Sequence, residues 1–365
     1  MKIDLIIIFT GLAAAILLFY RFPVIKKEAV TKEEMKLSVI IPARNEEDTL
    51  PLLLSDLRAQ KVTAHEIICV DDNSTDATAS RIESYGVRPQ SLKGKPEHWI
   101  GKSWAAQAGA DLAVGELLLF LDADVRMDEN GLARLLQSYK SDPMVLSVQP
   151  YHKVIMGYEN FSFFFNMIQT AANGLALPFR NRKSGLYGPI ILIRKEDYYK
   201  VGGHESVRSD IIEDMAFAQQ LRKKNIPYRL LLGDNGISYR MYGGGFKELC
   251  QGWIKNQASG ALRTPLWLVL MVFIWISSSA SVPIQLCRSV FEMDSFKFFV
   301  FSALYVLWVV IFWRISGYLG DFRKRTCIFY PVYLVFYIWI FLISVIKKTF
   351  HLKVTWKDRE IRLEK

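Results

Sequence analysis

Long apolar runs without a charged residue stand near both ends of the chain. Each approaches the roughly 20 residues that a helix needs to cross a bilayer, and buried core helices rarely run so long without a charge. Aromatic residues at the ends of the shorter runs suit the membrane interface. We therefore expect an N-terminal anchor within residues 1–22 and membrane segments within 264–346. The runs are Leu5–Tyr20, Pro265–Cys287, Phe298–Trp313 and Cys327–Ile346.

The middle of the chain, residues 36–263, has a different pattern. Apolar runs of a few residues alternate there with helical patterns, which is typical of strand–helix–strand units around a mostly parallel sheet. We predict an α/β domain over this range. The aromatic-rich segment Phe161–Phe179 suits either a core helix or a helix lying against a membrane surface. The clearest strand patterns are Leu37–Ile41, Glu66–Val70 and Glu116–Leu121.

Basic residues predict how the chain is oriented in a cell membrane. Only Lys2 precedes the first apolar run, whereas Lys26, Lys27, Lys32 and Lys36 follow it, so the α/β domain should face the cytosol. The same rule places the basic residues between the last two runs in the cytosol, which agrees with two crossings from 265 to 313. We expect a multi-pass protein of the cytoplasmic membrane.

The basic tail, residues 347–365, conflicts with this rule. If Cys327–Ile346 crosses the membrane, the tail lies outside the cell. A re-entrant or interfacial segment, with Pro331 near its start, removes the conflict. The sequence leaves both arrangements open.

Composition excludes several classes of protein. The chain is 51% hydrophobic and its four cysteines form no CxxC pair, which excludes a disordered chain, a disulfide framework and a zinc ribbon. The net charge of +10 admits nucleic acid, an anionic membrane surface or an anionic substrate. No basic stripe interleaved with aromatics accompanies the motifs, so we expect no nucleic-acid partner. The basic tail suits anionic lipid.

Acidic residues follow the predicted strands, where ligands bind in parallel sheets. The second strand ends in Asp71–Asp76, in which Ser74 and Thr75 equally suit a helix N-cap. A third ends in Asp122-Ala123-Asp124. Two carboxylates spaced in this way repel each other unless a cation or donor lies between them. Their hard oxygens suit Mg²⁺ or Mn²⁺ shared with a diphosphate.

These motifs, followed by Glu213-Asp214 before a helix, resemble the series of the family 2 glycosyltransferases of the GT-A fold. The resemblance covers about residues 36–260, and the apolar segments match the membrane-bound branch of the family. It implies inverting transfer of a hexose, glucose above all, from a UDP-sugar. A catalytically inactive scaffold is the rival from another class, but the acidic motifs are intact.

The resemblance also implies a role for each matched residue at the donor side. Asp72 would contact the uracil or ribose, beside the loop around Ala43 and Glu46. Asp122 would contact the sugar or ribose. Asp124 would bind the Mg²⁺ or Mn²⁺ that bridges the diphosphate and neutralises charge on the UDP leaving group.

Two further matches concern catalysis and charge. Asp214, with Glu213 beside it, would be the general base that takes a proton from the acceptor. The alternative is that both carboxylates compensate the dipole of the helix that they begin. Trp99–Ala105 matches lipid-glycosylating members, in which Lys102 would offer a charge to a phosphate or pyrimidine oxygen. A solvated lysine opening a helix is the other interpretation.

The acceptor side is less specific. Many membrane-bound relatives carry Gln-x-x-Arg-Trp where this chain has Gln251-Gly252-Trp253, and the departure counts against processive polysaccharide synthesis. Trp253 and Lys255 are the candidates for acceptor contacts, although Trp253 equally suits an interfacial anchor. The partner expected here is a lipid acceptor drawn from the bilayer.

Several strings are similar to a subfamily that glycosylates carotenoid carboxylic acids and forms a glycosyl ester. Such an acid, with a pKa near about 4.3, needs no base at neutral pH, whereas a hydroxyl lipid does. Diacylglycerol, a hydroxylated carotenoid or a polyprenyl phosphate therefore remain alternatives. We expect His152 and His204 within two of these strings to be structural. The strings are Leu146–His152, Lys195–Tyr199 with Gly202–His204, Arg240–Phe246 and Val354–Arg359.

Overall fold

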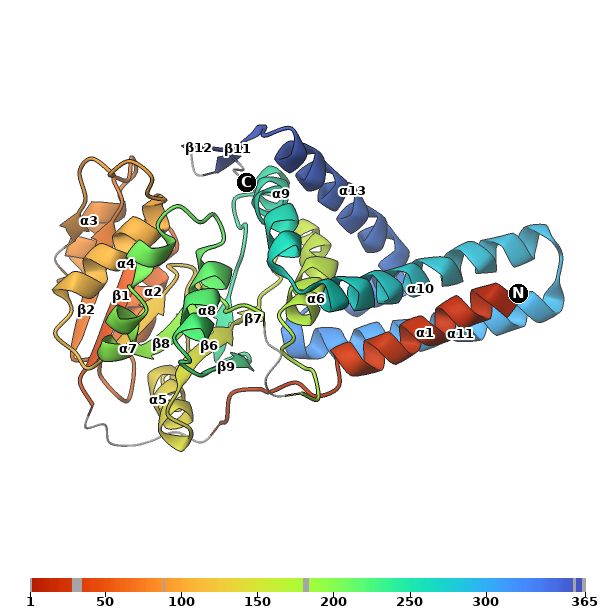
Figure 1. Cartoon of the computed structure of the whole chain (residues 1–365), viewed down its shortest axis with the longest axis horizontal. Coiled ribbons are helices and arrows are strands. Elements are labelled where there is room, and N and C mark those ends of the chain that lie inside the picture. Colours follow the sequence, from red (N-terminus) through yellow and green to blue (C-terminus); the bar gives the residue numbers. More distant parts are fainter. Residues whose placement is uncertain (1, 28–34, 88, 180–183, 357–358, 363–365) are drawn as a thin grey trace.

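The computed structural model describes residues 2–27, 35–87, 89–179, 184–356 and 359–362. Lys32, and residues 357–358 and 363–365 of the basic tail, lie outside them. The chain forms an α/β part at one end, and long helices project from it at the other end (Figure 1).

A seven-stranded sheet forms the centre of the α/β part, in the order β3-β2-β1-β4-β8-β6-β9. β1 pairs in parallel with both β2 and β4, so that Ile40 lies between Ile68 and Phe120. β8 is antiparallel to both of its neighbours, and the remaining pairs are parallel. The prediction of a mostly parallel sheet is confirmed. The strands are β1 (Leu37–Ala43), β2 (Glu66–Asp71), β3 (Gln90–Ser91), β4 (Leu117–Leu121), β6 (Val145–Gln149), β8 (Ile190–Arg194) and β9 (Tyr228–Leu232).

Helices cover both faces of this sheet. Because side chains alternate along a strand, Ile40 packs in the core that contains α4 and α8, whereas Val39 and Ile41 pack in the core that contains α2 and α5. Burial on both faces explains why the central strands are continuous apolar runs. The helices are α2 (Leu50–Arg58), α3 (Thr78–Ser84), α4 (Gly101–Leu112), α5 (Gly131–Ser141), α7 (Lys195–Lys200) and α8 (Glu213–Lys223).

A second, three-stranded sheet has the order β5-β10-β7. β5 (Val125–Met127) directly follows Asp124 and pairs antiparallel with β10 (Ile237–Tyr239), which pairs in parallel with β7 (Tyr151–His152). This sheet therefore brings Tyr239 and its neighbours to the Asp122–Asp124 segment. Two short 3₁₀ helices, η1 (Gly157–Ser162) and η2 (His204–Val207), lie in the connecting loops.

The aromatic-rich segment forms a buried helix. Phe163, Phe164 and Phe165 are consecutive in α6 (Phe163–Ala172), and all three are fully buried. Phe164 packs against Trp275 and Phe312 of the long helices, and Phe165 packs against Trp253 and Tyr337. Of the two interpretations that the sequence left open, the core helix is therefore the one observed. α6 joins the α/β part to the helices beyond it.

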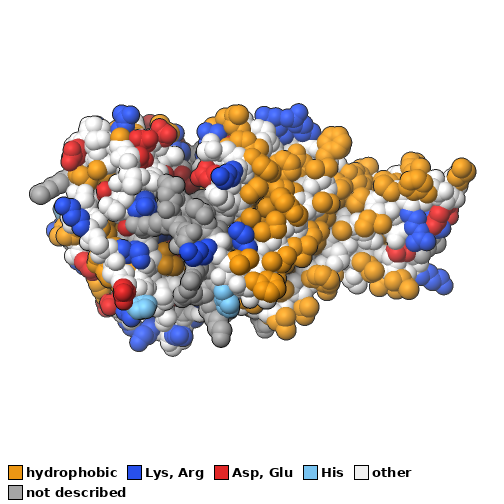
Figure 2. Space-filling model, turned by 90° about the horizontal axis from the view of Figure 1, so that it is seen from above, with side chains coloured by type: hydrophobic (Ala, Val, Ile, Leu, Met, Phe, Trp, Pro, Cys, Tyr) orange, Lys and Arg blue, Asp and Glu red, His pale blue; other side chains and the backbone are white. Residues whose placement is uncertain are grey.

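Three helices form the projecting bundle: α1 (Lys2–Leu18), α10 (Leu266–Phe291) and α11 (Ser295–Leu319). α1 lies so close to α10 that a side chain at Gly11 would lie 2.0 Å from Ser278 Cβ, and the Ser278 hydroxyl donates to the Ile8 carbonyl at 3.0 Å. Apolar side chains cover much of the helical part, and charged ones gather at its far tip (Figure 2).

α13 (Tyr330–Thr349) is set at an angle to this bundle and packs mainly on α9 (Phe246–Arg263). Pro331 occupies its first turn, where the missing N–H is not needed. Among the described residues, α10, α11 and α13 are long and apolar enough to cross a membrane. The short α12 (Lys324–Ile328) precedes α13, and the hairpin β11 (Lys353–Trp356) and β12 (Arg359–Arg362) follows it.

Candidate active site

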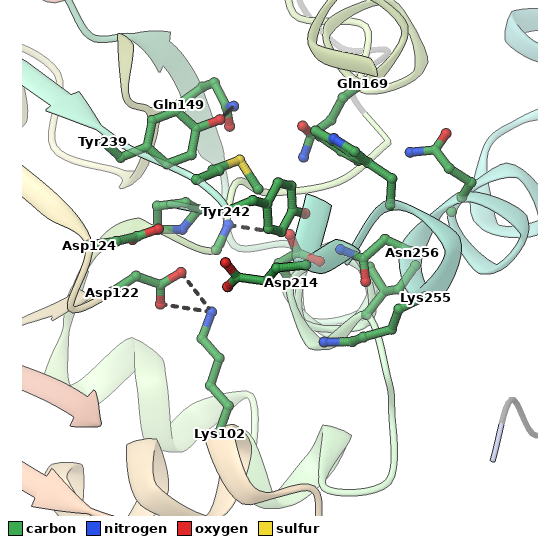
Figure 3. Close-up of a pocket in the computed structure, with 18 of the residues that line it drawn as sticks. Lys102, Asp122, Asp124, Gln149, Gln169, Asp214, Tyr239, Tyr242, Lys255 and Asn256 are labelled. Carbon is green, nitrogen blue, oxygen red and sulfur yellow. Dashed lines mark hydrogen bonds and ion pairs between the residues drawn. The ribbon is translucent and has the colours of Figure 1, made fainter. Parts of the chain in front are cut away.

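One cavity of about 1390 Å³ extends from the carboxyl edge of the large sheet to α10 and α13. Its walls bring together side chains from β1, the segment that follows β4, α4, α8 and α9, several of which point toward one another (Figure 3). All the residues that the sequence singled out for the site line this cavity: Ala43, Glu46, Asp72, Lys102, Asp122, Asp124, Glu213, Asp214, Trp253 and Lys255.

Hydrogen bonds join the loops after β1 and β2 into one wall of the cavity. The Arg44 guanidinium donates to the Asp72 and Asn73 carbonyls at 2.7 and 2.8 Å, and the Asp72 N–H donates to the Ala43 carbonyl at 2.9 Å. Asn45 and Asn73 both have positive φ, which asparagine tolerates better than most residues. Arg44 therefore orders this wall, a role that its sequence context did not predict.

Ser74 is part of this wall instead of a helix cap. Its backbone N–H and hydroxyl both donate to Asp71 Oδ1, and its hydroxyl accepts from the Asn45 N–H at 3.1 Å. The N-cap of α3 is Ala77, so the alternative of a Ser74 or Thr75 cap is wrong. Glu46 is held nearby, since its carboxylate accepts from the Thr49 hydroxyl at 2.6 Å.

Lys102 lies at the centre of the acidic side chains. Its Nζ is 2.8 Å from Asp122 Oδ1 and 3.1 Å from Glu213 Oε1. Burial lowers the pKa of this amine, but the two carboxylates outweigh burial and hold the pKa above its ordinary value. Lys102 does open α4, as the alternative proposed, yet its ammonium group is ion-paired inside the cavity (Figure 3).

Asp214 and Glu213, adjacent at the start of α8, titrate differently. The Gly188 and Met215 N–H groups donate to the two oxygens of Asp214 at 3.2 and 2.7 Å. Burial, followed by the charge of Glu213, raises the pKa of Asp214 to about 7. Burial also acts to raise the pKa of Glu213, but Lys102 and Lys255 hold it below its ordinary value. Such a split pair provides one ionised carboxylate and one that exchanges a proton near neutral pH.

Asp124 lies beside two buried tyrosines. Burial and then the Asp124 charge raise the pKa of Tyr239 and Tyr242, which keeps both phenols protonated. The Tyr239 hydroxyl accepts from Gln149 Nε2 at 2.6 Å and donates to Asn166 Oδ1 at 3.3 Å. None of Tyr239, Tyr242 and Gln149 was assigned to the site from the sequence. Tyr239 ends β10, which is too short to show a strand pattern, whereas Gln149 ends β6 and reaches the site through its contact with Tyr239.

The donor set at Asp124 suits a metal that is bound largely by a substrate. Within the ranges that the structure describes, no three His, Cys, Asp or Glu side chains are placed to hold one ion. Asp122 is ion-paired with Lys102, so a metal in this mode would use Asp124 as its protein carboxylate. Mg²⁺ characteristically uses one or two carboxylates with substrate phosphates and water, and these residues fit that mode.

Trp253 and Lys255 lie on α9 at the opposite wall. Trp253 is 2% exposed, stacks on Phe165 at 4.5 Å and donates its indole N–H to Ser162 Oγ at 3.1 Å. It is therefore packed between α9 and α6, and not at a lipid interface. Lys255 reaches into the cavity near Asp214 (Figure 3). Burial lowers its pKa, although the Glu213 charge opposes that effect.

The two histidines that the sequence singled out are buried and hydrogen-bonded. His152 Nδ1 lies 3.3 Å from Asn166 Nδ2, and His204 Nδ1 lies 2.9 Å from the Tyr198 hydroxyl. Burial lowers their pKa values to about 3 and about 4, so both rings are neutral at physiological pH. His152 thereby joins β7 to α6, and His204 joins η2 to α7.

Comparison with known proteins identifies the family to which this architecture belongs. The model of the Glycosyl transferase family 2 matches residues 38–200. The 4,4'-diaponeurosporenoate glycosyltransferase of Staphylococcus aureus (strain USA300) is 30% identical over 371 residues, which cover 100% of this chain and 98% of that relative. The enzyme of the same name from Staphylococcus haemolyticus (strain JCSC1435) is 34% identical over 258 residues, or 69% of this chain and 68% of that one.

A solved structure shares the fold over nearly the whole length. The mannosyltransferase PcManGT from Pyrobaculum calidifontis, in complex with GDP-Man and Mn²⁺, matches with a TM-score of 0.55 at 15% identity. The match covers 93% of this chain and 98% of that protein. The GT-A fold predicted from the sequence is thus confirmed, and the full-length similarity shows that the chain belongs to the family 2 glycosyltransferases.

Proposed function

We propose that this glycosyltransferase moves a hexose, glucose in the first instance, from a UDP-sugar to a lipid-soluble acceptor with inversion at the anomeric carbon. The acceptor we favour is a carotenoid carboxylic acid of the 4,4'-diaponeurosporenoate type, which gives a glycosyl ester. The observation that carries the proposal is the cavity that joins the strand-end carboxylates to apolar walls on α10 and α13. The full-length staphylococcal relatives support the choice of acceptor.

The donor would lie against the wall formed by β1 and β2. Asp72, with Ala43 and Glu46 beside it, would hold the uridine, and Asp122 would contact the sugar or ribose. Lys102 would offer its charge to a phosphate oxygen. Asp124 would hold Mg²⁺ or Mn²⁺, and the metal would neutralise the charge on the leaving diphosphate.

The acceptor would approach from the side of α9. One acceptor oxygen forms a bond to the anomeric carbon while the bond from that carbon to the diphosphate breaks, and UDP leaves with the electron pair. A hydroxyl gives its proton to Asp214, and the ionised Glu213 next to it raises the proton affinity of Asp214. A carboxylic acid in an apolar cavity also has a raised pKa, so that Asp214 can accept its proton near pH 7. Lys255 is suitably placed to attract an acidic head group.

We also propose how the protein lies in the cytoplasmic membrane. α1, α10 and α11 would cross it, with the α/β domain (36–263) in the cytosol. α13 would lie along the cytosolic leaflet, because it packs on α9 and its Lys348 Nζ lies 3.2 Å from Ser259 Oγ of that helix. The basic tail then stays on the cytosolic side, which removes the conflict in the charge pattern.

The test is UDP release from UDP-glucose by the purified, detergent-solubilised protein with Mg²⁺ or Mn²⁺. The two acceptors are 4,4'-diaponeurosporenoate and diacylglycerol, and the two proteins are wild type and Asp214→Asn. Use of the acid supports the glycosyl ester. Use of diacylglycerol alone, abolished by Asp214→Asn, identifies the hydroxyl-lipid alternative, which the presence of a base favours. No release with either acceptor contradicts the proposal.

A further inference from the structure

The part of the cavity farthest from the sheet is apolar and lies between two helices. α10 contributes Val269, Val272, Phe273 and Ile276, and α13 contributes Tyr337 and Ile338. From Val269 to Ala280, the last residue of α10 that lines the cavity, the rise of an α-helix gives about 16 Å. That is about half of the hydrocarbon thickness of a bilayer.

This apolar part reaches the outer surface of the molecule. Phe273 on α10 and Ile338 on α13 line the cavity, yet they are 66% and 37% exposed. Ile338 lies one helical turn from Val335 and from Leu342. These two belong to a stripe of exposed apolar residues along α13: Val332, Val335, Trp339, Leu342 and Ile346. The opening therefore lies on the exposed apolar surface of the helical part. It does not face the water around the α/β part.

Packing explains why the two helices leave a gap. α10 packs mainly on α1 and α11, whereas α13 packs mainly on α9. A direct link joins them where the Tyr330 hydroxyl donates to the Ser279 carbonyl at 3.0 Å. The two helices are thus held by different partners and diverge (Figure 1). A gap bounded by separately anchored helices persists without a side chain to fill it.

We propose that the space between α10 and α13 is a lateral entrance, through which the long apolar chain of the acceptor passes from the lipid into the active site. This inference rests on the proposed function and adds the path and the class of ligand, a chain at least as long as the apolar part of the cavity. The chain lies against α10 and α13, and its polar end reaches Lys255 and Asp214 on the far side of α9. An acceptor with a short chain needs none of this surface.

The first test places a bulky ring in the entrance. Ala280→Phe narrows the apolar part, and Ala303→Phe is the matched control, since Ala303 is exposed on α11 and does not line the cavity. Each protein is assayed with a long-chain acceptor and with a short, water-soluble acceptor that has the same head group. We expect Ala280→Phe to lower the ratio of kcat/KM for the long over the short acceptor at least tenfold. Ala303→Phe should leave the ratio at its wild-type value, and an unchanged ratio in Ala280→Phe overturns the proposal.

The second test does not depend on turnover. A long-chain fatty acid with a diazirine near its end is photo-crosslinked to the wild-type protein in nanodiscs, with and without an excess of the unlabelled acid. Labelling that the competitor removes should map to peptides of α10 and α13, while labelling of α11 should resist competition. Equal competition on all three helices overturns the lateral entrance. If competition maps to α10 and α13 but UDP-glucose is never turned over, the proposed function fails and the binding site stands.

Discussion

Replacing Asp214 by Asn should make the protein more stable in alkaline conditions while it removes the candidate base. Below pH 3.8 this carboxyl is protonated in both the folded and the unfolded chain and costs nothing. Between pH 3.8 and about 7 the unfolded chain releases the proton and the folded protein keeps it, so stability falls as pH rises. At about 1.36 kcal/mol per pH unit, the cost reaches about 4 kcal/mol above pH 7.

Asn cannot ionise, so the variant escapes this cost. It also loses one of the two hydrogen bonds that the Gly188 and Met215 N–H groups donate to Asp214. Both hydrogen bonds favour the ionised carboxylate, and this charge-dependent part is already contained in the pKa of about 7. The difference between pH 5 and pH 8 therefore isolates the charge. We expect the gain of Asp214→Asn over wild type to be about 3 kcal/mol larger at pH 8 than at pH 5, a Tm difference on the order of 4 °C for a chain of 365 residues.

Thermal unfolding in detergent at the two pH values measures this difference. Asp76→Asn is the control: burial acts to raise the pKa of Asp76, but hydrogen bonds led by that from Thr78 hold it below 3.8. Asp76 is therefore ionised in both states from pH 5 to pH 8, and its replacement should have the same effect at both. A gain for Asp214→Asn that is equal at pH 5 and pH 8, or smaller at pH 8, refutes the argument that Asp214 is held protonated by burial and by Glu213.

Four shorter predictions follow from other contacts. Lys102→Met should weaken UDP-glucose binding at least tenfold in calorimetry, because Asp122 and Glu213 then face the anionic donor without the ammonium group that pairs with both; unchanged affinity would contradict it. EDTA should abolish turnover and added Mg²⁺ or Mn²⁺ should restore it, so activity that survives chelation argues against a metal at Asp124. Gly252→Ala should lower stability by about 1–3 kcal/mol in thermal unfolding, since its Cβ would lie 2.2 Å from the Tyr242 ring, and an unchanged Tm is the contrary result. A green fluorescent protein fused after the tail should fluoresce in the cytosol; a dark fusion protein reached by external protease would show that α13 crosses the membrane.

The local pattern of apolar and polar residues was sufficient to predict much of the fold. The runs that became β1 and β4 are buried on both faces, and β2 is buried over its second half, so these strands could be recognised without knowing their neighbours. The acidic residues after them could be placed at one edge, because parallel strands end together. By contrast, β5, β7 and β10 have two or three residues each, too few for a period, and Tyr239 was missed with them.

Other features depend on contacts between distant residues. The ion pairs of Lys102 join residues 102, 122 and 213. The pKa values of Glu213 and Asp214 also diverge for tertiary reasons: burial and the Glu213 charge raise that of Asp214, whereas Lys102 and Lys255 lower that of Glu213. The apolar patterns of α6 and α13 were equally ambiguous, since protein and lipid both favour apolar side chains. Sequence determined the apolar segments, the central strands and the residue types at their ends. Tertiary structure alone decided which apolar faces meet protein and which charges share one cavity, because neither burial nor distance is a property of a single segment.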